Sequence, residues 1–137
     1  MYPEELCKPM RAELTNVGFV ELKTANEVDS LLSEKEKTVL IIVNSVCGCA
    51  AGNARPAVKM AIEFDVKPDV FATVFAGQDS EATSRAREYM LAYPPSSPSI
   101  ALFKNGEIVH LIERHHIEGR TAQMIADNLK DAFNQIC

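Results

Sequence analysis

The sequence predicts an α/β fold of three layers, in which helices cover both faces of a mixed central sheet. The runs TVLIIVN (38–44) and VFATVFA (70–76) are almost wholly apolar, as strands buried on both faces are. Segments with helical periodicity alternate with these runs, which favours parallel strands joined by crossover helices. An Asn-Gly pair at 105–106 joins SIALF (99–103) to EIVHLI (107–112), which predicts an antiparallel hairpin that adds two edge strands.

The N-terminal part is expected to add a helix, a turn and a short strand before this alternation begins. Residues 4–15 are expected to form an extra helix, interrupted at Pro9 because proline lacks an amide donor. The stretch TNVG (15–18) predicts a turn, and Phe19 and Val20 predict a short strand.

One helix is expected before the first buried strand and another after it. TANE (24–27) is typical of a capping box, in which the Thr24 hydroxyl and the Glu27 carboxylate satisfy each other's amide donors. The helix that it starts is expected to end near Lys35. A second helix is expected over 48–64, with a kink because Pro56 lies inside it.

The C-terminal half continues with two more helices. The first is expected over 80–92, started by a turn and cap at Asp79 or Ser80, and YPPSSPS (93–99) ends it. Thr121 opens the last helix, which has one apolar stripe of Ile125, Leu129, Ala132, Phe133 and Ile136. The predicted order is β-α-β-α-β-α-β-β-α after the leading helix, and the 137 residues suit a single domain, 1–137.

The amino-acid composition argues against two classes of partner, nucleic acids and membranes. Hydrophobic residues make up 47% and charged residues 24%, the net charge is -5, and the lysines and arginines form no run. Nucleic acid is therefore not an expected partner. No apolar stretch reaches the roughly 20 residues of a membrane span, and the polar N-terminus does not resemble a signal peptide. We expect a cytoplasmic protein without a membrane partner, in which thiols stay reduced.

Cys47 and Cys49 are the chemically most informative residues. They follow a predicted buried strand and open a predicted helix, where exposed amides favour a thiolate and so depress a cysteine pKa. Since residues two apart share no helix face, Cys47 is expected in the preceding loop and Cys49 in the first turn. Gly48 lacks a β-carbon and leaves the backbone free to bring the sulfurs together. Their disulfide would close a small strained ring and be readily reduced.

A second feature supports the same site. Ser97-Pro98 lies just before a predicted strand, and X-Pro bonds are the common cis peptides. A cis bond there is expected to present the Ser97 backbone to a substrate held over Cys47.

Other candidate residues have plainer expected roles. Arg55 is expected at a solvated helix position, with a cationic neighbour of the thiolate as the alternative. His115 and His116 are expected at a strand end, where adjacent side chains point apart, although either could approach the thiolate. Tetrahedral zinc commonly needs four ligands, so no metal site is expected.

Three further residues are expected to have structural roles. Cys7 is expected to be a half-buried helix residue, and His110 an ordinary strand residue. Cys137 is expected at a frayed chain end, an accessory redox role being the less favoured alternative.

The stretches PMRAELTNVGF, VNSVCGCAAGNARPA, TVFAGQD and PPSSPS closely resemble the bacilliredoxin family, and the element order resembles the thioredoxin fold. The likeness covers nearly the whole chain. It implies a thioredoxin-like protein that removes bacillithiol from S-bacillithiolated cytosolic proteins. By this resemblance Cys47 is the nucleophile that takes up bacillithiol, and Cys49 is the resolving or modulating thiol.

The resemblance also implies what accompanies the chain. It implies no tightly bound cofactor, with bacillithiol as a thiol substrate and an unidentified bacillithiol-disulfide reductase system as a partner. Unlike thioredoxin, the chain has no tryptophan and has one residue between its cysteines. Two alternatives stay open: disulfide isomerisation through a Cys47-Cys49 couple, and a non-catalytic metal or iron-sulfur protein, including a metal site shared between two chains.

Overall fold

The structure, a computed structural model, describes residues 1–137 and contains one five-stranded sheet in the order β1-β3-β2-β4-β5. Strands β1, β3 and β2 are parallel, whereas β4 is antiparallel to both β2 and β5. The predicted mixed sheet is thus confirmed. Its strands are β1 (Val20–Glu21), β2 (Thr38–Asn44), β3 (Val70–Phe75), β4 (Ser99–Lys104) and β5 (Glu107–Ile112).

The predicted hairpin forms, but only one of its strands lies at the edge. Strand β4 is inserted between β2 and β5, and its residues 99–103 are all buried. Strand β5 alternates between exposed and half-buried positions from Glu107 to His110, as an edge strand does, and is buried only at Ile112. Burial of β4 on both faces favours the inner position, which brings the start of β4 next to the end of β2.

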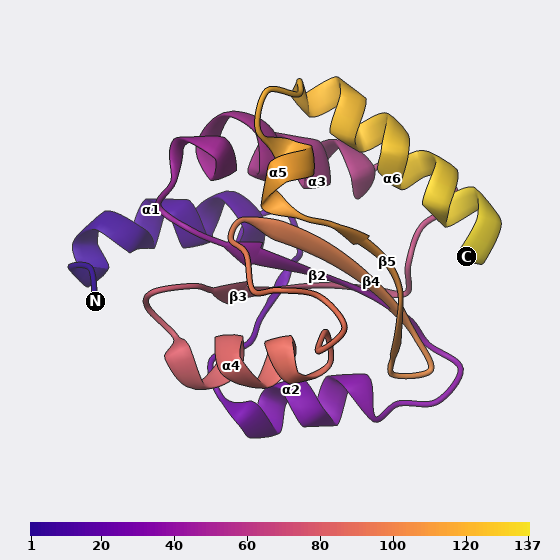
Figure 1. Cartoon of the computed structure of the whole chain (residues 1–137), viewed down its shortest axis with the longest axis horizontal. Helices are drawn as coiled ribbons and strands as arrows, with labels where there is room; N and C mark the ends of the chain where they lie inside the picture. Colours follow the sequence, from indigo (N-terminus) through magenta and orange to yellow (C-terminus); the bar gives the residue numbers. More distant parts are fainter.

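The sheet lies between two helix layers (Figure 1). Helices α1 (Glu4–Thr15), α3 (Arg55–Ala61) and α6 (Ala122–Ile136) cover one face, and α2 (Ala25–Leu32) and α4 (Ser80–Glu88) cover the other. Because strand side chains alternate, Leu40 and Ile42 pack in the first core and Ile41 in the second. The three-layer thioredoxin-like architecture with an additional N-terminal helix is therefore confirmed.

The helix that follows β2 departs from the predicted form. It begins at Gly48, but residues Ala50–Ala54 form a π-helical turn, and α3 starts only at Arg55 with Pro56 in its first turn. A wider turn thus lies directly before the proline and leaves it in the first turn of α3, where the missing N–H of a proline is tolerated. Such turns are a known cause of irregularity in helices, and many lie at functional sites.

Several predicted boundaries differ from the structure. Helix α1 runs unbroken through Pro9, which lies in its second turn and removes one hydrogen bond. Helix α2 has the predicted capping box but ends at Leu32, not near Lys35, and Glu36 has a left-handed φ of 64°. This residue begins the turn into β2.

Helix α4 ends at Glu88, short of the predicted 92, because the Tyr89 and Met90 amides bond to carbonyls three residues back. Asp79 precedes α4 without a side-chain capping bond. The predicted cap is absent because the Arg11 guanidinium donates to the Asp79 carboxylate at 3.0 Å.

One helix was not predicted. Arg114–Ile117 forms a short helix, α5, where the sequence indicated the end of a strand. Ile117 is fully buried in the core beneath α6 and anchors this turn. The turn carries Arg114, His115 and His116 on one short segment above the sheet (Figure 1). No helix of the chain combines the length and the apolarity that a membrane span needs.

Candidate active site

Cys47 and Cys49 lie where β2 leads into the following helix. Cys47 is in the bend after β2, and Cys49 is in the first helical turn, as the two-residue spacing predicted. Both side chains are half-buried and both thiols are free. Gly48 between them is exposed, and a β-carbon there would meet nothing within 4 Å. The space beside Gly48, between the two cysteines, is therefore open.

Two donors converge on the Cys47 sulfur. The Cys49 backbone N–H donates to Cys47 Sγ at 3.3 Å, and Nη2 of Arg114 donates to it at 3.3 Å. The Cys49 amide bond is the largest cause that lowers the pKa of the Cys47 thiol, and the Arg114 charge adds to it against the effect of burial. A lowered pKa increases the thiolate fraction at neutral pH.

Cys49 has the opposite character. Its hydrogen bond with Cys47 raises the pKa of the Cys49 thiol, and burial and the negative charges of Cys47 and Glu118 act in the same direction. The two thiols are therefore differentiated. Cys47 is the sulfur that ionises first, and Cys49 stays protonated beside it.

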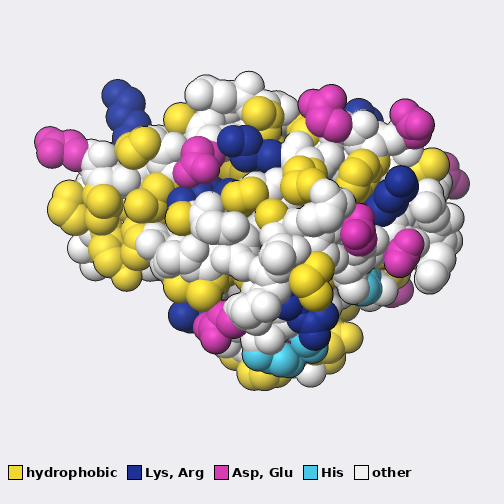
Figure 2. Space-filling model, turned by 90° about the horizontal axis from the view of Figure 1, so that it is seen from above, with side chains coloured by type: hydrophobic (Ala, Val, Ile, Leu, Met, Phe, Trp, Pro, Cys, Tyr) yellow, Lys and Arg dark blue, Asp and Glu magenta, His cyan; other side chains and the backbone are white.

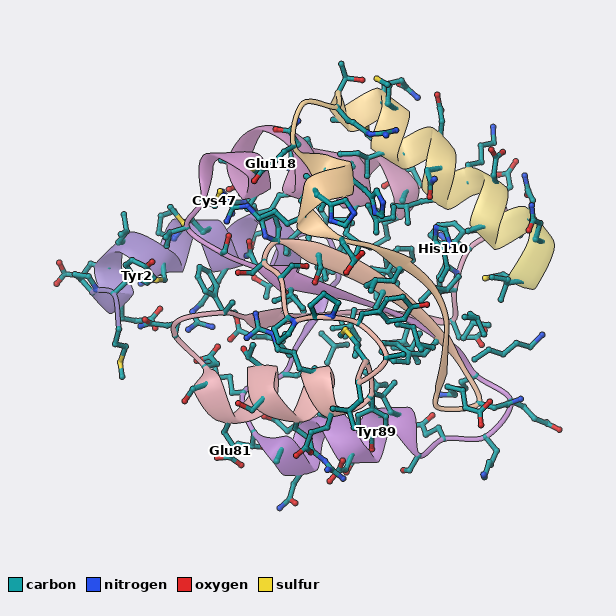
Figure 3. All side chains as sticks on the ribbon, viewed as in Figure 1. Tyr2, Cys47, Glu81, Tyr89, His110 and Glu118 are labelled. Atoms are coloured by element: carbon teal, nitrogen blue, oxygen red, sulfur yellow. The ribbon has the colours of Figure 1, made fainter.

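Arg114 links three parts of the site and was not identified from the sequence. Its Nη1 donates to the Ser97 carbonyl at 3.1 Å, and its Nε bonds to Glu118. Figure 3 shows Cys47 and Glu118 close together near the end of β2. The Glu118 bond and the Cys47 charge both raise the pKa of Arg114, so its charge is retained. A lone arginine 67 positions away from Cys47 carries no sequence signal for this contact.

The loop before β4 lies beside the thiols. Ser97-Pro98 is a cis peptide, as the sequence predicted, and Ser99 pairs with Val43 near the end of β2. The Ser97 carbonyl is taken by Arg114, whereas the Ser97 amide makes no hydrogen bond within the chain. This amide is a free backbone donor next to the cysteine pair.

Arg55 has neither of its expected roles. It is 1% exposed, and its Nη1 donates to the Asn44 side chain and to the Ser45 carbonyl, both at 2.9 Å. Its Nε donates to Glu13 of α1 at 2.9 Å. Because the Ser45 hydroxyl accepts the Cys47 amide at 3.2 Å, Arg55 supports the loop that carries Cys47 from below.

The remaining cysteines and His110 stand apart from this network. Cys7 is fully buried, more than predicted, and burial raises the pKa of its thiol. Cys137 is exposed but not frayed, because its amide donates to the Phe133 carbonyl at 2.8 Å. His110 lies on β5, as predicted, and bonds to Asn128 at 2.7 Å.

The fold defines the class of protein. A solved thioredoxin of Fasciola hepatica superposes with a TM-score of 0.59 at 18% identity, over 85% of this chain and 98% of the thioredoxin. The thioredoxin fold is thus confirmed. With two free thiols at the end of its central strand and relatives named Bacilliredoxin, the chain is a thiol oxidoreductase.

Relatives define the family. A family model described as "Disulphide isomerase" matches residues 2–137. A Bacilliredoxin of Cytophaga hutchinsonii is 55% identical over 99% of this chain and all of its own length. A Bacilliredoxin of Bacillus licheniformis is 53% identical over 99% of this chain and 95% of its own. The chain belongs to the bacilliredoxin family.

Proposed function

We propose that this protein removes bacillithiol from S-bacillithiolated cytosolic proteins, with Cys47 as the nucleophile. The convergence of the Cys49 amide and the Arg114 guanidinium on Cys47 Sγ carries the proposal. These donors favour a thiolate, which is the attacking species in disulfide exchange. The small thiol itself is inferred from the relatives named Bacilliredoxin.

The proposed reaction is an exchange without net oxidation. The Cys47 thiolate attacks the bacillithiol sulfur of a mixed disulfide, and a new bond forms between Cys47 and bacillithiol as the old S–S bond breaks. The substrate cysteine leaves as a thiolate and takes up a proton. Arg114 neutralises charge on Cys47 before attack, and the free Ser97 amide and the exposed Gly48 border the space for the incoming chain, with Pro98 buried next to Ser97.

Release of bacillithiol can follow through either of two thiols. Cys49 loses its proton and attacks the Cys47 sulfur, which expels bacillithiol and leaves a Cys47-Cys49 disulfide. Otherwise the thiolate of a second bacillithiol attacks the bacillithiol sulfur of the mixed disulfide. The bond to Cys47 breaks, Cys47 leaves as a thiolate, and the resulting bacillithiol disulfide is reduced by a separate bacillithiol-disulfide reductase system. The raised pKa of Cys49 favours slow resolution, because only its thiolate attacks. No tightly bound cofactor takes part in either route.

Intact-protein mass spectrometry tests the proposal with a purified S-bacillithiolated protein. The Cys49→Ser variant should accumulate one bacillithiol on Cys47 while the substrate loses its adduct. The Cys47→Ser variant should leave the substrate modified. Removal of bacillithiol by Cys47→Ser at the wild-type rate would contradict the proposal, as would an adduct on Cys7 or Cys137.

Disulfide isomerisation is a second candidate, favoured by the matching family description and by two free thiols one residue apart. Refolding of a scrambled disulfide protein separates the two activities. Isomerisation through a couple should be lost in Cys49→Ser, whereas transfer of bacillithiol to Cys47 should persist. Equal refolding by the wild type and by Cys47→Ser would exclude the isomerase function.

A further inference from the structure

Three metal-binding side chains gather on the turn that joins β5 to α6. Glu113, His115 and His116 each offer one ligand atom, and these atoms lie within 4.8 Å of one another. We propose that they form a site for a divalent transition-metal cation, separate from the thiols. Figure 2 shows a group of histidine side chains in cyan at the lower edge, below basic side chains, and a smaller cyan area at the right.

The helical turn creates this cluster. The predicted strand end would make the two histidines point apart, but on α5 their ring centroids lie 4.0 Å apart. His115 Nε2 lies 3.7 Å from a carboxylate oxygen of Glu113. Two imidazoles and one carboxylate on neighbouring positions make a three-ligand set, which leaves further positions for water.

The charges around Glu113 are consistent with the binding of a cation at its carboxylate. Its side chain is 15% exposed, and it forms no ion pair with any lysine or arginine. The adjacent Arg114 is directed to Glu118 and Cys47 instead. The Glu113 carboxylate accepts the His116 backbone N–H in a capping box and lies beside the His115 ring, so no fixed positive charge is paired with it, and a bound cation would balance it.

The ligand types select the kind of cation. Imidazole with one carboxylate suits Zn²⁺, Ni²⁺ or Cu²⁺, whereas Mg²⁺ and Ca²⁺ prefer oxygen ligands. His116 Nδ1 accepts the Glu113 backbone N–H at a long 3.3 Å, so a metal at this nitrogen displaces only a weak bond. His115 is 69% exposed and its ring can turn toward the cation.

Thiolates bind the same cations, so the test requires a protein without accessible thiols. A variant with Cys47, Cys49 and Cys137 replaced by serine is titrated with Zn²⁺ against a chromophoric chelator. Wild-type protein blocked with iodoacetamide serves as a second preparation in case the variant does not fold. The proposal predicts one equivalent of Zn²⁺ in both.

Histidine variants then locate the site. Replacing His115 and His116 together by glutamine should weaken Zn²⁺ binding by at least about tenfold, and Glu113→Gln should also weaken it. His110→Gln removes the only other histidine, which is bonded to Asn128, and should leave binding unchanged. Absence of binding in the thiol-blocked protein, or binding that survives the double histidine change, would overturn the proposal. Loss on His110→Gln alone would also overturn it. Because exchange requires Cys47, none of these outcomes tests the proposed function.

Discussion

Arg55 is the residue whose replacement best tests how the active-site loop is supported. Its guanidinium is buried between α1 and the loop, where it donates to Glu13, Asn44 and the Ser45 carbonyl. Arg55→Met keeps a flexible apolar side chain of similar length and removes all three hydrogen bonds. The side-chain volume is largely retained, so the loss is mainly electrostatic.

The expected loss in the free energy of unfolding depends on which groups lose a hydrogen-bond partner in Arg55→Met. Glu13 is 37% exposed and can bind water instead, so its loss counts little. The Asn44 side chain keeps the bond from the Ser45 amide, but loses the charged donor. The buried Ser45 carbonyl loses the guanidinium bond. At about 1–3 kcal/mol for each buried group left short of a donor, the free energy of unfolding should fall by about 3 kcal/mol.

Urea unfolding measures this change. For a domain of this size about 3 kcal/mol corresponds to a loss of about 10 °C in Tm. Lys59→Met is the matched control, because it makes the same charge change on the same helix α3 at a half-buried side chain that forms no ion pair or hydrogen bond. A loss below about 1 kcal/mol for Arg55→Met, or an equal loss for Lys59→Met, would refute the proposed support of the loop.

Further predictions concern the Cys47 thiol and the turn between β4 and β5. Arg114→Gln removes a charge that lowers the pKa of Cys47, so its alkylation at pH 7 should slow and its pH profile should move to higher pH; an unchanged profile would argue against the contact. Gly106→Ala should cost about 2 kcal/mol, because φ is +78° and the new β-carbon would lie 2.6 Å from the Leu32 carbonyl oxygen. Gly52→Ala, with nothing within 4 Å, should be near neutral in the same unfolding assay. Folding lowers the pKa of Cys47 below the ordinary 9.0 and so releases a proton. Stability of the wild type relative to Cys47→Ser should therefore rise with pH up to about 9, and fall as pH drops through the folded pKa; a flat difference would contradict the ionised thiol.

The sequence was sufficient for the parts of the fold that depend on local patterns. The run 38–44 became the central strand β2 because its five middle residues are all aliphatic, and all seven residues are buried. Thr24 and Glu27 form the predicted capping box within four residues of chain. A cis Ser97-Pro98 bond was also anticipated, since the peptide bond before a proline has only a weak preference for trans.

Local patterns were insufficient where a competing contact decided the outcome. Asp79 was expected to cap α4, but Arg11, 68 positions earlier, takes its carboxylate. Arg55 was expected in solvent, yet three partners satisfy a buried guanidinium. No spacing along the chain encodes such pairs, because each depends on two elements meeting in space.

By itself, the sequence determined the order of the elements, the buried central strand and the position of two cysteines at the end of that strand. Burial and hydrogen bonding act over a few neighbouring residues there, so composition and spacing predict the outcome. Only the tertiary structure decided which cysteine ionises first. Insertion of β4 beside β2 brings Ser97 next to the thiols, and the α5 turn adds Arg114. A pKa depends on charges and donors within a few ångströms, and folding alone brings these groups together.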